Sequence, residues 1–518
     1  MAPIKVDYSL YLVTDPNLVP DGTTLEEQVE KAIKGGVTIV QLREKDAETK
    51  DFIDRAKKIH EMTKAAGIPL LINDRLDVAL AIDAEGVHIG QDDIDVATAR
   101  KLLGPDKIIG LSVNYVSEAT KAVEDGVDYL GVGAVYDTST KIPKQPPIGI
   151  SGLRKILSYL SSVHRYMPAV AIGSINLQTA RNVLNLSAVP SRSLDGIAVV
   201  SAIIASPDPE TVSRELLQIV KEPPYWMSVV KDRTPPAIIA DVPTIIAKVQ
   251  ETTPLVHHLI NRVATNFAAN VTLAVGASPV MSENIPEFAD FSSIENGSLL
   301  VNMGFATPEA VEMYLAAITE YNQRLRPVVY DPVAGGASTL RKEAVKALLN
   351  RSHFDIIKGN EGEIFAVAGE MSHMRGVDST SSSSMEKKVH VVEGLATKEK
   401  TIVVLTGPQD IISDGITTFV LSNGHDYLSS ITASGCVLGS ILTACLTVSL
   451  EDRFLAAVAG VLLYTIAAER AAAQPSVRGP GTFVPALIDE LYLLRNMCAK
   501  GDSSWLSAAK VERFVLTS

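Results

Sequence analysis

The sequence TIVQLREK at residues 38–45 shows the unit from which the first half of the chain is built: a short β-branched run that ends in polar and charged residues. Runs of this kind alternate with helical patterns, which is typical of parallel strands joined by helices. The predicted strands lie at residues 10–14, 38–43, 69–73, 86–90, 108–113, 129–135, 169–173 and 196–201. Eight such units in about 220 residues is the repeat number and size of an α/β fold, the TIM (β/α)8 barrel.

A second α/β pattern follows residues 222–236, which contain four prolines around a Tyr-Trp pair and predict a linker. We therefore expect a first domain at residues 1–221 and a second at residues 237–518. The predicted strands of the second domain lie at residues 299–303, 327–330, 354–358, 401–405 and 418–421. Its predicted helices lie at residues 254–275, 308–323, 340–349, 435–447 and 454–473. Because this pattern is not eightfold, it favours an open doubly wound sheet. Residues 371–388, with four consecutive serines, predict a mobile surface insertion.

The composition excludes several classes of protein. Of 518 residues, 46% are hydrophobic, which excludes disorder. A net charge of −13 gives no general attraction to nucleic acid or to an anionic membrane. Three cysteines are too few for a disulfide framework or a four-ligand zinc site. The longest apolar stretch, residues 454–468, is shorter than the roughly 20 residues of a membrane span, so we expect a buried helix in a soluble, cytoplasmic protein without a signal peptide.

The site of a TIM barrel lies at the carboxyl ends of its strands, where this sequence is unusually polar. Asp74 and Asp93 offer the carboxylate oxygens that Mg²⁺ accepts when a substrate phosphate supplies further ligands. Arg43, Lys45 and Lys141 would add positive charge, although each charged residue taken alone is more often a solvated loop residue or half of a salt bridge. Small residues after strands seven and eight would let backbone amides approach a phosphate.

His88 lies inside a predicted strand, so we expect a core or hydrogen-bonded residue rather than a catalyst. Glu44 and Asp92 alternate with the residues chosen for the site and are expected to face outward or to hold the loops.

The segments QLREK at 41–45, ND at 73–74, GVHIGQDD at 86–93 and TSTK at 138–141 resemble the successive motifs of thiamine-phosphate synthase. In that family a barrel joins a pyrimidine diphosphate to a thiazole phosphate and releases diphosphate. The resemblance implies that Asp74 and Asp93 bind Mg²⁺ and that Ser112 and Lys141 act in catalysis. It assigns the pyrimidine diphosphate to Gln41, Arg43, Lys45, Asn73, Ser112 and Lys141, and the thiazole phosphate to Thr138, Thr140, Gly173, Ser174, Val200 and Ser201. Ser174 departs from the family, which commonly has glycine there.

In the second half, the segment TASGC at residues 432–436 precedes a long apolar helical pattern. Its amides would point from a helix N-terminus and favour an anion, although small residues before a helix are equally often a cap or a close-packing device. A thiol at a helix N-terminus, here Cys436, can have a lowered pKa. DPVAGG at 331–336 and KGNEGE at 358–363 place acids at the ends of two further strands, where open α/β sheets bind ligands.

These segments, with residues 261–270, 276–281, 405–407 and 479–481, occur in the order found in hydroxyethylthiazole kinase, a ribokinase-like family. The resemblance implies that Met281 and Ala433 contact the thiazole alcohol and that Lys358 and Thr406 bind ATP. It also implies that Asp331 and Glu363 support Mg²⁺ and that Cys436 stands where related sugar kinases have an aspartate base. Ala433 and Lys358 depart from the family, in which Gly and Arg are common.

The two halves form a consistent pair, because the kinase product is a substrate of the synthase. We therefore expect a bifunctional enzyme of thiamine biosynthesis that takes small-molecule substrates and forms a homo-oligomer through its kinase domain. Two alternatives stay open at this point: a phosphate-binding barrel of another pathway fused to a sugar kinase, and a non-catalytic sensor of the same pathway.

Overall fold

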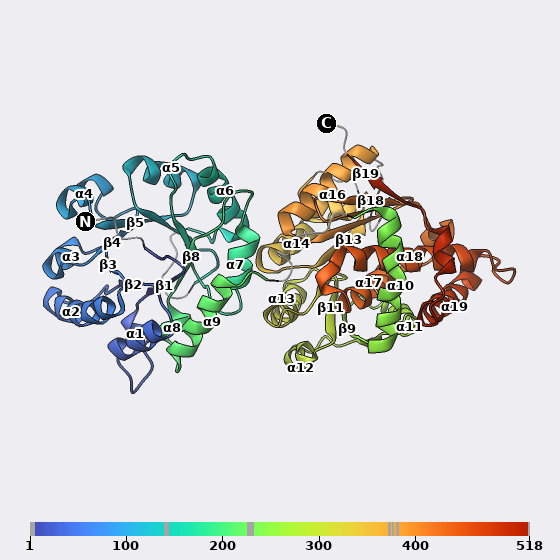
Figure 1. Cartoon of the computed structure of the whole chain (residues 1–518), viewed down its shortest axis with the longest axis horizontal. Helices are drawn as coiled ribbons and strands as arrows, with labels where there is room; N and C mark the ends of the chain where they lie inside the picture. The colour runs from blue at the N-terminus through green and yellow to red at the C-terminus, as the bar shows by residue number, and fades with distance from the viewer. Residues whose placement is uncertain are drawn as a thin grey trace. The chain divides into compact units, whose positions relative to one another are not determined.

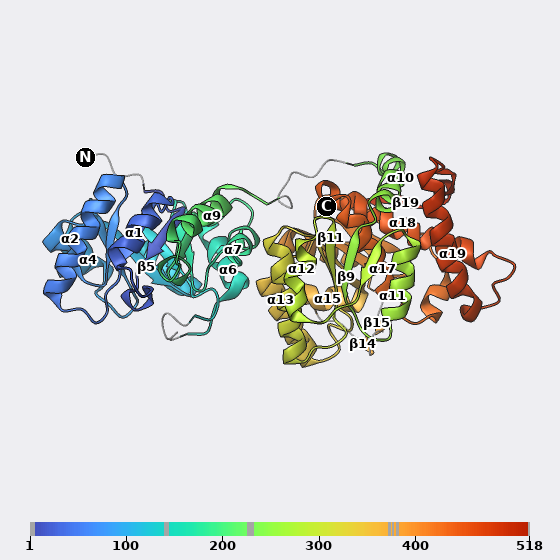
Figure 2. The same cartoon turned by 90° about the horizontal axis from the view of Figure 1, so that it is seen from below.

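The computed structural model describes residues 6–138, 145–224, 233–370, 374–375, 378–379 and 383–515. The chain divides into two compact units, Met1–Pro223 and Pro224–Ser518. Figures 1 and 2 show the elements of each unit from two directions.

The first unit is a closed barrel of eight parallel strands in sequence order, in which β1 pairs with both β2 and β8. The strands are β1 Leu10–Val13, β2 Ile39–Leu42, β3 Leu70–Asn73, β4 Gly86–Ile89, β5 Ile108–Val113, β6 Tyr129–Val132, β7 Ala169–Ile172 and β8 Gly196–Val199. All eight predicted strands are present, which confirms the TIM barrel.

Helices surround these strands (Figure 1). They are α1 Leu25–Lys34, α2 Thr49–Ala66, α3 Leu76–Ile82, α4 Val96–Leu103, α5 Val116–Asp125, α6 Gly149–Ser161, α7 Ala180–Ser187, α8 Ser201–Ile204 and α9 Pro209–Lys221. Local sequence fixes several of their ends. Thr24 and Glu27 form a reciprocal capping box at the start of α1, and Gly67 ends α2 in the left-handed conformation.

The barrel interior contains large side chains, including Tyr11 and Tyr129. Space for the Tyr129 ring comes from Gly110 on the neighbouring strand, because a Cβ at that position would lie 2.1 Å from a ring carbon. Glycine is therefore required at position 110 to admit a buried aromatic ring.

The second unit contains a nine-stranded sheet in the order β10-β9-β11-β12-β13-β16-β17-β18-β19. The strands from β10 to β16 are parallel and the remaining pairs are antiparallel. Their bounds are β9 Leu255–Leu259, β10 Ser278–Val280, β11 Gly297–Asn302, β12 Val328–Asp331, β13 Ile356–Asn360, β16 Ile402–Thr406, β17 Asp410–Ser413, β18 Thr418–Leu421 and β19 Val511–Phe514, and a separate pair joins β14 Met374–Arg375 to β15 Asp378–Ser379.

The helix predicted at residues 254–275 is wrong in its first half, where the chain forms β9 and only then α11 Thr265–Ala274. The apolar spacing of this segment also fits a helix, but β9 lies inside the sheet between β10 and β11, and that pairing decides its structure. The sheet is therefore mixed and has more strands than the five that were predicted.

Helices of the second unit include α10, which begins at Pro235 within the range predicted as linker. They are α10 Pro235–Thr252, α11, α12 Phe288–Ser293, α13 Pro308–Gln323, α14 Thr339–Arg351, α15 Glu361–Ala368, α16 Met385–Glu399, α17 Ser434–Thr447, α18 Arg453–Ala472 and α19 Pro480–Ala499. Proline is favourable at the start of α10, because the first helical N–H has no partner within a helix.

The last part of the predicted surface insertion belongs to helix α16. Ser384 caps this helix, and the Ser383 N–H donates a hydrogen bond of 2.8 Å to a carboxylate oxygen of Glu361. Residues 385–388 are therefore helical rather than part of a loop. Of the four serines, Ser381 and Ser382 lie outside the described residues.

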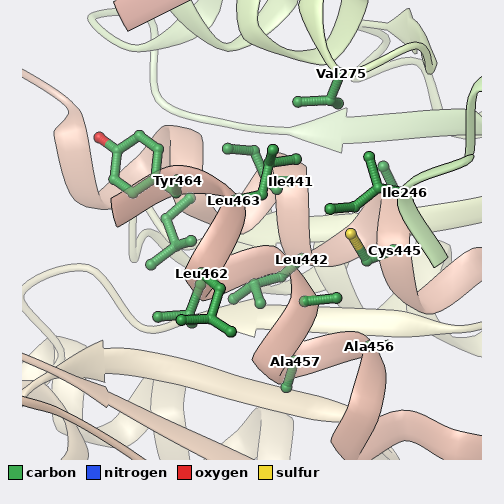
Figure 3. Packing of buried hydrophobic residues seen from close by; sticks show 14 of the residues in the cluster. Ile246, Val275, Ile441, Leu442, Cys445, Ala456, Ala457, Leu462, Leu463 and Tyr464 are labelled. Carbon is green, nitrogen blue, oxygen red and sulfur yellow. The ribbon is translucent and has the colours of Figure 1, made fainter. Parts of the chain in front are cut away.

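Helix α18 is the centre of the apolar core in the second unit. Figure 3 shows Leu462, Leu463 and Tyr464 packed among side chains of α17 such as Ile441 and Leu442. The stretch Leu450–Ala472 is long and apolar enough to cross a membrane, but 89% of its apolar window is buried inside the unit. The prediction of a buried helix for residues 454–468 is confirmed, but the expectation that the apolar stretch is too short for a span is wrong, because it extends to both sides of that range.

Candidate active sites

Charged side chains gather in the loops after β2 and β3 of the barrel. The Lys45 ammonium pairs with the Asp74 carboxylate, and the Arg43 guanidinium lies 3.1 Å from a carboxylate oxygen of Asp15. Asp74 follows Asn73, the buried last residue of β3, and has a left-handed backbone with φ of 61°. Strand order thus brings these predicted residues to one rim of the barrel.

Asp93, after β4, lies beside Asp74 on this rim. One of its carboxylate oxygens accepts a hydrogen bond of 2.7 Å from the Gly90 N–H. Burial and the adjacent Asp74 carboxyl raise the pKa of Asp93. Two carboxyl groups that share a site raise each other's pKa in this way, and the Lys45 ammonium only partly offsets the effect. A divalent cation would remove the repulsion, and the oxygens of this pair are the ligands that Mg²⁺ prefers.

Gln41 and Ser112 contact polar side chains inside the barrel. The Gln41 Nε2 donates a hydrogen bond of 2.6 Å to the Tyr11 hydroxyl. The Ser112 hydroxyl lies 2.9 Å from Nε2 of His88, whose Nδ1 lies 2.7 Å from the Tyr129 hydroxyl. The expectation that His88 is a hydrogen-bonded strand residue is confirmed.

Small residues follow β7, as expected for a phosphate-binding end. Gly173 and Ser174 have φ of 113° and 50°, and a Cβ on Gly173 would lie 2.7 Å from the Ala134 Cβ. Ser174 holds this turn through its hydroxyl, which donates to the Asp137 carbonyl. Serine therefore adopts here the backbone conformation that favours the glycine common in the family.

The other residues predicted for the thiazole phosphate lie in three places. Val200 precedes the short helix α8, and Ser201 is its first residue. Thr138 is partly buried. Thr140 and Lys141 lie outside the described residues.

A buried polar cluster lies at the carboxyl ends of β11, β12 and β13. Lys358 Nζ lies 3.0 Å from Asp331 Oδ2 and donates a hydrogen bond of 2.8 Å to the Gly435 carbonyl. The Asn302 amide donates to the same Asp331 oxygen at 2.7 Å. The other oxygen, Asp331 Oδ1, is buried and has no hydrogen-bond partner among the described residues. An acceptor of this kind is the feature expected where a ligand is missing.

Lys358 is charged although it is buried. Burial alone would lower its pKa, but the carboxylates of Asp331 and Glu363 outweigh that effect and raise the pKa of Lys358 above its ordinary value. Its ammonium therefore balances the negative charge of Asp331 inside the unit. The structure ties this predicted ATP-binding residue to Asp331 and to the start of α17.

Cys436 lies in the first turn of α17 and is connected to the same cluster. The Asn261 Nδ2 lies 3.5 Å from its Sγ and donates to Asn302 Oδ1 at 2.8 Å. Burial, together with the Asp331 carboxylate, raises the pKa of the Cys436 thiol. The lowered pKa that a helix N-terminus can give a thiol is not found for Cys436, where burial has the largest effect and raises it.

Ala433 and Glu363 lie at helix starts beside the cluster. Ala433 precedes α17 in the left-handed conformation, with φ of 66°, which explains why glycine is common there in the family. Glu363 accepts hydrogen bonds of 2.8 Å from the N–H groups of Ala334 and Asn360. Burial, and next the Asp331 carboxylate, raise the pKa of Glu363 to about 7.

Thr406 and Met281 complete the predicted kinase residues. Thr406 ends β16, and Met281 follows β10 and packs against the apolar core of the unit. Next to Thr406, the buried Asp410 accepts a hydrogen bond of 3.0 Å from the Gly407 N–H. Burial raises the pKa of Asp410 to about 7.

Four residues of these sites were given no role from the sequence, although Asn261 begins the segment 261–270 that contributes to the kinase resemblance. Asn261 and Asn302 could have been found, because both follow or end a strand at the carboxyl edge of a parallel sheet. Tyr11 and Tyr129 carried no such signal, since an aromatic residue within a buried strand is usually an ordinary core residue.

Each site offers two carboxylates to a metal. Within the described ranges, no three His, Cys, Asp or Glu side chains form a cluster that could hold a metal ion. Two carboxylates fit Mg²⁺, which usually takes one or two of them and completes its coordination with water and substrate phosphates.

Comparison with known proteins agrees with the division of the chain into two units. The "Hydroxyethylthiazole kinase family" model matches residues 246–497, and the "Thiamine monophosphate synthase" model matches residues 10–203. The probable thiamine biosynthetic bifunctional enzyme of Schizosaccharomyces pombe is 46% identical over 516 residues, which cover 98% of this chain and 99% of that protein. The thiamine biosynthetic bifunctional enzyme of Saccharomyces cerevisiae is 40% identical over 95% of this chain and 96% of that protein. The thiamine-phosphate synthase of Chloroflexus aurantiacus is 47% identical over 42% of this chain and 94% of that protein.

The fold and the two sites thus define a two-domain α/β transferase. The chain belongs to the family of thiamine biosynthetic bifunctional enzymes, with an N-terminal thiamine-phosphate synthase domain and a C-terminal hydroxyethylthiazole kinase domain. Membership of this family argues against both alternatives that the sequence left open, a barrel of another pathway fused to a sugar kinase and a non-catalytic sensor. Membership of these families implies the use of ATP and, in general, of Mg²⁺.

Proposed function

We propose that residues 237–518 phosphorylate 4-methyl-5-(2-hydroxyethyl)thiazole with ATP. Residues 1–221 would then join the thiazole phosphate to 4-amino-2-methyl-5-hydroxymethylpyrimidine diphosphate, giving thiamine phosphate and diphosphate. The observation that carries this proposal is a pair of carboxylates at the carboxyl ends of parallel strands in each unit. In the kinase unit, one oxygen of Asp331 lacks a partner among the described residues.

In the kinase unit, Asp331 and Glu363 would hold Mg²⁺. The bound cation would neutralise charge on the phosphates of ATP. Burial raises the pKa of Asp331, and Lys358 opposes that rise. Lys358 also donates to the Gly435 carbonyl, which fixes the first turn of α17 beside the carboxylate. The amides of this turn would donate hydrogen bonds to the phosphoryl group as it passes from ATP to the thiazole hydroxyl, and the Lys358 charge would stabilise it.

Cys436 would position the thiazole hydroxyl rather than remove its proton as a strong base. Its raised pKa keeps the thiol protonated near neutral pH. Phosphoryl transfer depends chiefly on positioning and on charge stabilisation, so a strong base is not required. We expect Cys436→Ala to lower kinase turnover only about tenfold, whereas a functional thiolate base would make the loss far larger.

In the barrel, Asp74 and Asp93 would hold Mg²⁺ against the diphosphate of the pyrimidine substrate. Arg43 and Lys45, and Lys141 outside the described residues, would add positive charge as the C–O bond breaks. The turns at Gly173 and Ser174 and at Val200 and Ser201 would bind the thiazole phosphate through backbone amides.

We also propose that the enzyme acts in the cytoplasm as a homo-oligomer formed through the kinase unit. Val263 and Phe305 support this, because both are exposed apolar side chains close in sequence to the site residues Asn261 and Asn302. Light scattering of the whole chain and of a Phe305→Glu variant tests it, since a monomer in both cases contradicts it.

One assay tests the reaction sequence. Purified protein receives the thiazole alcohol, ATP, Mg²⁺ and the pyrimidine diphosphate, and thiamine phosphate is measured by chromatography. We expect product only when all four are present, and we expect supplied thiazole phosphate to replace both the alcohol and ATP. Failure of that replacement would contradict the division of labour between the two units.

A further inference from the structure

A continuous chain of hydrogen bonds crosses the interior of the barrel. It runs from Gln41 on β2 to Tyr11 on β1, to Tyr129 on β6, to His88 on β4 and to Ser112 on β5. The four heavy-atom distances are 2.6, 2.7, 2.7 and 2.9 Å. Its two ends, Gln41 and Ser112, are both residues assigned to the pyrimidine substrate in the proposed function.

The three central residues are built into the barrel with little freedom to move. The Tyr11 and Tyr129 side chains are fully buried. Gly110 leaves room for the Tyr129 ring, and a Cβ on Gly131 would lie 2.9 Å from His88 Cε1. A buried polar chain whose central members are satisfied fixes the orientation of its side chains, so it can also fix the orientation of the polar groups at its two ends.

Proton counting gives the chain a direction. Burial raises the pKa values of Tyr11 and Tyr129, so each phenol keeps one proton to donate. Because the Gln41 amide nitrogen donates to Tyr11, the Tyr11 proton goes to Tyr129 and the Tyr129 proton goes to His88 Nδ1. Nε2 of His88 then carries its proton and donates to the Ser112 oxygen. In this arrangement the protons of Tyr11, Tyr129 and His88 each have an acceptor within the chain.

The direction decides what the two ends offer to a ligand. With one N–H of its amide donating to Tyr11, Gln41 leaves its carbonyl oxygen available as an acceptor. With its oxygen accepting from His88, Ser112 offers its own proton as a donor. A reversed chain would exchange both properties at once, so the hydrogen-bonding character of one end is coupled to that of the other.

We propose that Tyr11, Tyr129 and His88 are positioning residues of the synthase site, which hold Gln41 as an acceptor and Ser112 as a donor. This rests on the proposed function of the barrel. It fits an aminopyrimidine diphosphate, whose amino group donates and whose ring nitrogens and diphosphate oxygens accept. The residues act through Gln41 and Ser112 and are not themselves expected to touch the substrate.

The first test is a double-mutant cycle on the full chain with Tyr129→Phe and Ser112→Ala. Loss of one positioning hydrogen bond should lower synthase kcat about tenfold in the single Tyr129→Phe variant. In the Ser112→Ala background the same change should cost a clearly smaller factor, because one of the two residues through which it acts is gone and only its effect on Gln41 is left. Equal factors in both backgrounds would overturn the proposal, since they would indicate a merely structural role.

The second test uses Tyr11→Phe and a substrate analogue with an oxo group in place of the 4-amino group. Release of the Gln41 amide should reduce discrimination against the analogue at least about tenfold, because a rotated amide can donate to the oxo group. Unchanged discrimination would overturn the proposal. This test stays decisive if Tyr129→Phe fails to fold.

Tyr8→Phe is the matched control. Tyr8 packs against the Tyr129 ring, with centroids 4.9 Å apart, but its hydroxyl is not part of the chain. It should therefore leave synthase kinetics within about twofold of the unmodified protein. If the unmodified protein itself does not turn over the pyrimidine diphosphate, the proposed function fails. If it does and the cycle is additive, only the present inference fails.

Discussion

The two sites use the same residue types in opposite surroundings. On the barrel rim, the Lys45 and Asp74 side chains are 48% and 20% exposed, and they pair across loops. In the kinase unit, the Lys358 and Asp331 side chains are 3% and 1% exposed, and they pair inside the protein. A lysine and an aspartate thus form an ion pair in both places, but solvent screens only the first.

Because of this difference in burial, substitutions at the two sites should differ in their effect on folding stability. An exposed ion pair contributes about 0 to 1 kcal/mol, so the rim can change with little effect on folding. Removal of one partner of a buried pair leaves an unbalanced charge and costs about 3 to 5 kcal/mol. The barrel site should therefore lose activity without loss of fold, whereas the kinase site should lose both.

The largest expected effect is that of Asp331→Ala. It removes the proposed metal ligand and the carboxylate that is hydrogen-bonded to Lys358, so kinase activity should fall more than about a thousandfold. Thermal unfolding of the kinase unit should shift downward, and synthase activity with supplied thiazole phosphate serves as the internal control. If the unfolding temperature of the kinase unit were unchanged, the buried Lys358–Asp331 pair would not contribute to its stability as expected.

The second largest effect is expected from Asp74→Ala, which should lower synthase turnover about a hundredfold. Its free energy of unfolding should change by less than about 1 kcal/mol. Asp77→Ala is the matched control, because it removes another exposed ion pair of the barrel, that with Arg75. Steady-state kinetics and chemical denaturation distinguish the two variants. Normal production of thiamine phosphate by Asp74→Ala would refute the rim as a metal site.

A smaller, pH-dependent effect is expected at Asp410, whose pKa is raised to about 7 by burial. Between about pH 4 and 7 the unfolded chain releases this proton before the folded chain does, so the stability of the kinase unit falls as pH rises through this range. Asp410→Asn removes the titration and can still accept from the Gly407 N–H. Its unfolding midpoint should exceed that of the unmodified protein more at pH 8 than at pH 5. An equal difference at both pH values would be evidence against a raised pKa.

The smallest effect is expected from Ala433→Gly, at the left-handed residue before α17. Relief of the Cβ conflict should stabilise the kinase unit by about 1 kcal/mol while kinase activity is retained. Ser174→Gly in the barrel relieves the same backbone conflict but also removes the hydrogen bond to the Asp137 carbonyl, so a smaller gain is expected there. Loss of kinase activity in a stabilised Ala433→Gly protein would mean that the methyl group itself contacts a substrate.

The sequence was most informative where local pattern decides structure. All eight barrel strands could be predicted because each is a short apolar run followed by polar residues, and Asp74 and Asp93 followed from strand order alone. The strand β9 could not, since its apolar spacing suits a helix and only pairing with β10 and β11 decides its form. The contacts of Asn302 and of the Tyr11–Tyr129 pair join residues far apart in sequence, and no local pattern predicts such meetings.

Each unit has its own apolar core, and no core cluster among the described residues includes side chains from both units. The two activities nevertheless share one polypeptide, so a cell makes them in a fixed one-to-one ratio. Quality control acts on that whole polypeptide. A variant that unfolds only the kinase unit should therefore lower the cellular amount of the intact synthase as well, although the barrel itself is unchanged.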